Sequence, residues 1–143
     1  MDTWAIEARG LQKHFRDTHA VRGLDLCVPR GEVFGLLGPN GAGKTTTLEM
    51  LEGLATPDRG EILILGMDWR RHARTIRSRI GVLLQYTLLD EKITVREALQ
   101  MFGSFYPKPR RAEELLQLVQ LEEKADSYQS KLSGGQRQRL AIA

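Results

Sequence analysis

The strongest constraint on what this chain can fold into is a glycine-rich run at residues 38–47, Gly-Pro-Asn-Gly-Ala-Gly-Lys-Thr-Thr-Thr. It follows a continuously apolar stretch at 33–37, typical of a strand buried on both faces, and precedes a helical pattern that ends near Gly53. Because glycines lack a Cβ, the loop amides can approach phosphate oxygens, and the helix start adds unpaired N–H groups and a positive dipole end. This order of strand, loop and helix predicts a phosphate-binding loop, the Walker A motif.

The side chains of the loop predict the chemistry of its ligand. Lys44 places a point charge near the outer phosphates of a nucleotide, and Thr45 offers a hydroxyl to Mg²⁺. Thr46 can add a hydroxyl to a neighbouring phosphate. The simpler alternative is a glycine-rich turn with a surface lysine, which the flanking strand and helix patterns disfavour.

A second helix start follows at residues 132–136, Leu-Ser-Gly-Gly-Gln. Ser133 is an N-cap candidate, and two glycines leave bare amides at the beginning of the helix that runs to the last residue. Such a terminus suits an anion, although an ordinary capped helix after a loop is the plainer interpretation.

The remaining pattern predicts an α/β domain. An alternating stretch at 20–28 is typical of an antiparallel strand with one solvated face, and a continuously apolar stretch at 80–84 predicts another buried strand ending at Gln85. Thr94 and Glu97 have the spacing of a capping box, and a further helix is expected at 112–121. A helical block therefore follows Gln85.

Together these residues resemble the nucleotide-binding domain of the ATP-binding cassette (ABC) transporter family. Residues 38–47 resemble its Walker A motif, Gln85 its Q-loop glutamine, and 132–136 its signature motif. The amino-acid sequences of residues 28–40 and 94–97 are similar to those of the drug- and antibiotic-resistance exporters. The resemblance covers the whole chain.

The resemblance implies a P-loop NTPase core of the ABC ATPase type, with an N-terminal antiparallel β subdomain, a helical subdomain and a missing C-terminal part. Residues 1–143 are then a partial nucleotide-binding domain. Within it, 1–85 form the β subdomain and P-loop core, 86–130 the helical subdomain, and 131–143 the signature motif with the start of its helix.

The resemblance also implies a function. Two such domains pair head to tail, and ATP with Mg²⁺ lies between the Walker A of one and the signature motif of the other, driving export through transmembrane permease subunits at the cytoplasmic face of the membrane. Phe15 would stack on adenine, and Thr45 and Gln85 would contact Mg²⁺, with Gln85 sensing the γ-phosphate. The nucleotide-binding residues implied are Phe15, Val21, Gly38, Asn40, Gly41, Ala42, Gly43, Lys44, Thr45, Thr46, Gln85, Ser133, Gly134, Gly135 and Gln136.

The sequence also departs from the family pattern. The family has a Walker B Asp, a catalytic Glu and a switch His after the signature helix, and none can be placed there. The apolar-acidic stretches at 62–68 and 88–91 precede the signature motif, as do the three histidines, His14, His19 and His72. We therefore expect the chain to be the front part of a larger domain, and to bind ATP weakly without hydrolysing it at a family-like rate.

Composition limits the alternatives. The formal net charge of +3 is too small to argue for nucleic acid, one cysteine excludes a disulfide framework, and the apolar stretches are too short to span a membrane. Five arginines at 70–79 form a basic patch, usually a solvated helix face. A non-hydrolytic module that pairs with a complete domain, or an ABC protein acting on nucleic acid, remain the alternatives, and salt-dependent nucleic-acid binding would identify the latter.

Overall fold

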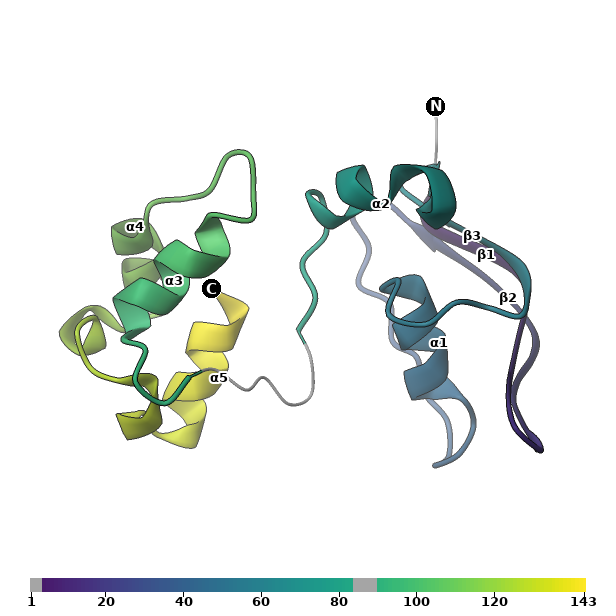
Figure 1. The fold of residues 1–143 in the computed structure, drawn as a ribbon, viewed down its shortest axis with the longest axis horizontal. Helices are drawn as coiled ribbons and strands as arrows, with labels where there is room; N and C mark the ends of the chain where they lie inside the picture. Colours follow the sequence, from purple (N-terminus) through teal and green to yellow (C-terminus); the bar gives the residue numbers. More distant parts are fainter. Residues whose placement is uncertain (1–3, 84–89) are drawn as a thin grey trace. The chain divides into compact units, whose positions relative to one another are not determined.

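A computed structural model describes residues 4–83 and 90–143 (Figure 1). The chain divides into two compact units, Met1–Ile80 and Gly81–Ala143, each with a hydrophobic core of its own. Within the described residues, no helix is long and apolar enough to cross a membrane.

The first unit is built on a four-stranded antiparallel sheet with the order β2-β1-β3-β4. Its strands are β1 (Trp4–Phe15), β2 (Thr18–Pro29), β3 (Arg59–Ile64) and β4 (Met67–Asp68). The long β1–β2 hairpin closes where Phe15 faces Thr18. The antiparallel pairing predicted from the alternation at 20–28 is confirmed.

Two helices pack on this sheet, α1 (Lys44–Leu51) and α2 (Trp69–Arg77). Leu11 of β1, Met50 of α1 and Ile76 of α2 are fully buried. The buried cluster that joins the sheet and both helices consists of Ala8, Leu11, Val21, Met50, Leu51, Ile62, Ile64 and Ile76.

The apolar stretch before the phosphate loop does not form the buried strand that the sequence predicts. Residues 33–37 belong to no strand, and Val33 and Leu37 are 103% and 91% exposed. The described part of the stretch at 80–84 likewise forms no strand. An apolar run becomes a central strand only when neighbouring strands take its N–H and C=O groups, and none of the described residues pairs with either stretch.

The second unit is helical. It contains α3 (Val95–Gly103), α4 (Ala112–Leu118), the short 3₁₀ helices η1 (Glu122–Lys124) and η2 (Gln129–Lys131), and α5 (Gly134–Ile142). Its buried cluster consists of Val95, Leu99, Ala112, Leu116, Val119, Leu121, Ala125, Leu132 and Leu140.

Polar contacts fix the helix ends of this unit. The capping box predicted before α3 is confirmed, because the Thr94 hydroxyl accepts from the Glu97 amide at 3.2 Å and the Glu97 carboxylate accepts from the Thr94 amide at 2.8 Å. Arg139 of α5 donates to the carbonyl oxygen of Val119, which follows α4, at 2.9 Å. The signature helix is thereby tied to the end of α4.

A candidate nucleotide-binding site

The phosphate loop passes directly over strand β2. Gly43 has a φ of +83°, and a Cβ added to it would stand 2.2 Å from the carbonyl oxygen of Ala20 and 3.2 Å from Val21. Gly41 has a similar φ of +82°, but its Cβ would meet nothing within 4 Å. Backbone conformation favours glycine at both positions, and only at Gly43 does packing also exclude a side chain.

Helix α1 begins immediately after this glycine with open amides. Gly43 is the N-cap and supplies no side-chain hydrogen bond, and the first helical bond runs from the Thr47 amide to the Gly43 carbonyl at 2.8 Å. The amides of Lys44, Thr45 and Thr46 therefore precede the first turn of bonding and are available to an anion. A phosphate group fits this arrangement, because these three amides have no hydrogen-bond acceptor within the described residues.

Two hydrogen bonds hold the Lys44 side chain against the loop. Its ammonium donates to the carbonyl oxygens of Gly38 and Pro39, at 2.7 Å each. The ammonium is thereby held beside the first residues of the loop. A phosphate must compete with two neutral carbonyls for this ammonium, and a charged acceptor forms the stronger bond.

The three threonines after Lys44 differ in exposure. Thr45 is exposed, Thr46 is partly buried, and Thr47 is buried with 3% of its surface exposed. Thr45 can present its hydroxyl to a cation, whereas Thr47 packs into the unit. No group of three or more His, Cys, Asp or Glu side chains that could hold a metal ion occurs within the described residues.

Phe15 and Val21 occupy different environments on the hairpin. Phe15 ends β1 with 48% of its surface exposed, and the Lys13 ammonium lies 5.5 Å from its ring centroid. Val21 is 6% exposed and joins the core directly beneath the loop at Gly43. Phe15 can offer a ring face to a ligand, while Val21 supports the loop from below.

Asp58 organises the end of β1, and sequence reasoning missed it. Its carboxylate accepts from the His14 amide at 2.7 Å and from the Lys13 ammonium at 3.0 Å. The His14 amide, and then Lys13, hold the pKa of Asp58 below its ordinary value. The two partners lie more than forty residues away in sequence, so no short motif could have indicated these contacts.

The signature segment forms a capping box at the start of α5. The Ser133 hydroxyl accepts from the Gln136 amide at 3.2 Å, and the Gln136 side-chain oxygen accepts from the Ser133 amide at 2.9 Å. The predicted N-cap role of Ser133 is therefore confirmed. The Ser133 hydroxyl keeps its own proton to donate, and a Cβ on Gly134 or Gly135 would meet nothing within 4 Å. The helix start is open to an approaching group.

The predicted site residues are distributed over both units. Val21, the loop residues Gly38 to Thr46 and Phe15 belong to the first unit, and residues 133–136 belong to the second. Gln85 lies outside the described residues, so its predicted contacts with Mg²⁺ and the γ-phosphate stay a prediction.

The family model described as "ABC transporter" matches residues 21–143. The chain belongs to the ABC transporter family. The resemblance seen in the sequence is thereby confirmed, and the matched residues include both the phosphate loop and the signature segment.

The names of curated relatives mention ATP binding and export. The chain is 45% identical over 143 residues to the "Nod factor export ATP-binding protein I" of Ralstonia nicotianae, covering 96% of this chain and 44% of that protein. It is 44% identical over 146 residues to the protein of the same name from Rhizobium meliloti, covering 99% of this chain and 44% of that protein. The chain thus spans about half the length of the curated relatives it matches.

Solved structures support the ABC ATPase fold. A structure described as the "ATP binding subunit of ABC transporter" matches with a TM-score of 0.85 and 29% identity, covering 96% of this chain and 60% of that one. The ADP conformation of an ATP-binding cassette matches with a TM-score of 0.80 at 23% identity, covering 97% of this chain and 63% of that one. The predicted α/β P-loop fold, with an antiparallel N-terminal sheet and helices, is confirmed for a partial chain.

Proposed function

We propose that this chain is the nucleotide-binding front part of an ABC exporter's ATP-binding subunit. The observation that carries the proposal is the geometry of the phosphate loop, where Gly43 packs against Ala20 and α1 begins with uncapped amides. ATP with Mg²⁺ is the ligand that suits this loop in an ABC protein.

Each loop residue has a proposed role at the nucleotide. The amides of Lys44, Thr45 and Thr46 hold the phosphates, Lys44 exchanges its carbonyl partners for phosphate oxygens, and Thr45 offers its hydroxyl to Mg²⁺. Gln85 is proposed as a further Mg²⁺ ligand. The exposed ring of Phe15 is proposed to stack on adenine.

The signature segment is proposed to serve a second nucleotide-binding domain. Its open helix start and the free proton of Ser133 suit the γ-phosphate of a nucleotide bound by the partner in a head-to-tail dimer. Transmembrane permease subunits, contacted through the helical block 86–130, are proposed to hold the chain at the cytoplasmic face of the membrane. The relatives' names support export as the direction of transport.

We expect the 143-residue chain to bind ATP without steady turnover. Hydrolysis needs an oriented water and a base or positioning group besides the phosphate cradle. Within the described residues, no hydrogen bond or ion pair joins a carboxylate to loop 38–46. Steady turnover that Lys44→Ala abolishes would contradict this expectation.

Equilibrium binding of a fluorescent ATP analogue with Mg²⁺ tests the proposed site. Lys44→Ala is expected to weaken binding about tenfold to a hundredfold, because it removes a charge-assisted contact to phosphate. Lys92→Ala is the matched control, since Lys92 is an exposed lysine of the second unit, and it should leave affinity unchanged. Equal affinities for both variants and the unaltered chain would overturn the proposal.

A further inference from the structure

Helix α2 and the two residues that follow it carry a dense group of arginines. Arg70, Arg71, Arg74, Arg77 and Arg79 are all exposed, and no acidic residue occurs in segment 69–79. The net charge of the whole chain, +3, is smaller than the charge of this segment alone, so the rest of the chain is slightly acidic. Positive charge is therefore concentrated in segment 69–79, and the exposed surface formed by these five arginines is here called the basic face.

The guanidinium groups of the basic face are not neutralised within the described chain. No ion pair joins any of these five arginines to a carboxylate there, whereas Arg9 contacts one carboxylate and Arg96 contacts two. The acidic residue just before α2 is also occupied, because the Asp68 carboxylate accepts from the amides of Arg70 at 2.8 Å and Arg71 at 3.2 Å. The basic face therefore presents uncompensated charge to solvent.

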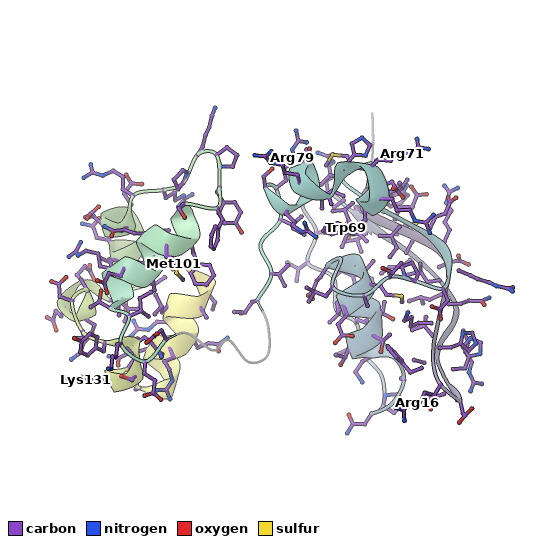
Figure 2. The ribbon with its side chains drawn as sticks, viewed as in Figure 1. Arg16, Trp69, Arg71, Arg79, Met101 and Lys131 are labelled. Atoms are coloured by element: carbon purple, nitrogen blue, oxygen red, sulfur yellow. The ribbon has the colours of Figure 1, made fainter. Side chains whose placement is uncertain are left out.

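The inner side of α2 fixes the basic face in place. Ile76 is fully buried, and the Trp69 indole donates to the carbonyl oxygen of Leu51 at 3.1 Å. A Cβ on Gly53 would stand 2.9 Å from the Trp69 ring, and the guanidinium carbon of Arg77 lies 6.0 Å from the centroid of the same ring. Figure 2 shows Trp69 on the inner side of α2, with Arg71 and Arg79 extending outward. The apolar side of α2 therefore packs against the core of the first unit.

We propose that the basic face binds the anionic headgroups of a phospholipid membrane surface. The inference rests on the proposed function, because an exporter subunit works beside a membrane. Arginine forks bind phosphate oxygens through paired hydrogen bonds, and clustered cations near an anionic bilayer are attracted to it additively. Single-stranded nucleic acid is disfavoured, since such binding needs exposed aromatic rings and Trp69 is packed inward.

Vesicle co-flotation of the 143-residue chain tests this inference. Binding is expected to phosphatidylcholine vesicles that contain phosphatidylglycerol, to be absent with phosphatidylcholine alone, and to weaken as salt rises. The triple variant Arg70→Gln, Arg71→Gln, Arg74→Gln should lose about fivefold in partitioning per arginine, about a hundredfold in all. It leaves the Arg77–Trp69 contact intact. The corresponding triple lysine variant should keep most of the binding, since it keeps the charge.

A control variant with the same loss of charge elsewhere makes the test specific. Arg30→Gln, Lys108→Gln and Arg110→Gln together remove three exposed cations outside the basic face, and this variant should bind vesicles nearly as the unaltered chain does. Equal losses in both triple variants would overturn the inference, because net charge alone would then explain the binding. Absence of binding to anionic vesicles at low salt would overturn it too.

Two further measurements separate the remaining outcomes. Tighter binding to duplex RNA or DNA than to vesicles at equal phosphate concentration would overturn the inference in favour of nucleic acid. Affinity for the fluorescent ATP analogue is measured on every variant, and unchanged affinity shows that the first unit is folded. Failure of the unaltered chain to bind nucleotide would refute the proposed function, and the vesicle result could still be interpreted. If the glutamine variant does not fold, the lysine variant provides the test.

Discussion

At the scale of single residues, Gly43 is the position where the phosphate loop tolerates least change. Gly43→Ala places a methyl group 2.2 Å from the Ala20 carbonyl oxygen in addition to straining a φ of +83°. Gly41→Ala meets only the backbone strain, about 1–2 kcal/mol. We expect urea unfolding to show a loss of stability at least about 1 kcal/mol larger for Gly43→Ala. Equal losses would mean that the contact with β2 does not constrain the loop.

Asp58 makes a pH-dependent contribution to stability. Because the pKa of its carboxyl is lower in the folded chain than the ordinary value of 3.8, the carboxylate stabilises the fold above 3.8, and that stabilisation is lost as pH falls through the lowered pKa. Asp58→Asn should therefore lower the urea midpoint at neutral pH, and its difference from the unaltered chain should shrink below pH 3.8.

The control for Asp58 is an exposed carboxyl that makes no hydrogen bond within the described residues. Glu32 meets this description, and Glu32→Gln should leave the urea midpoint nearly unchanged across the same pH range. A difference for Asp58→Asn that stays constant down to acid pH would show that the hydrogen bonds to Lys13 and His14 do not depend on its charge.

These residues also show what sequence patterns can reveal. The positions of Gly43 and Ser133 at helix starts could be predicted, because each depends on the helix that begins beside it. The close approach of Gly43 to Ala20 could not be predicted, because it depends on β2. The role of Asp58 could not be predicted, because Lys13 and His14 reach it only once β1 has paired with β3. Contacts between neighbouring residues can be predicted from the local sequence, whereas contacts between distant segments depend on the assembled sheet.

At the scale of elements, α5 depends on its capping box. Ser133→Ala removes the acceptor for the Gln136 amide, and replacing an N-cap serine by alanine typically costs about 1 kcal/mol. Because Leu140 of α5 lies in the helical core, the loss should appear as faster hydrogen exchange throughout the second unit. Gln136→Glu is the matched variant, since a glutamate at this position also completes the box. Equal acceleration of exchange in both variants would contradict the assigned contacts.

The lack of pairing strands among the described residues explains the incorrect strand predictions. Residues 33–37 and 80–83 have the apolar character of central strands, yet their side chains and backbone need neighbours on both sides to form one. The β1–β2 hairpin needs only itself and β3, so it forms as its alternation predicts. An apolar run indicates that a segment suits a buried environment. Whether the segment becomes a strand depends on a neighbouring strand that can pair with it.

At the scale of the whole molecule, the two predicted nucleotide-contacting segments belong to different units, each with a hydrophobic core of its own. If the signature segment serves a partner's nucleotide, one chain alone offers MgATP its phosphate loop and the other residues proposed for the same nucleotide, but not residues 133–136. Hydrogen exchange should therefore show that MgATP protects residues 38–47 at any chain concentration. Protection of 133–136 should increase with chain concentration, because it requires a second copy.

Lys44→Ala provides the control for this last prediction. It should remove protection at 38–47 and, in a mixture with the unaltered chain, it should still allow its own segment 133–136 to be protected by the partner's nucleotide. Protection of 133–136 in dilute chain, independent of concentration, would contradict the head-to-tail arrangement. That result would instead require the signature segment to contact nucleotide bound to the same chain.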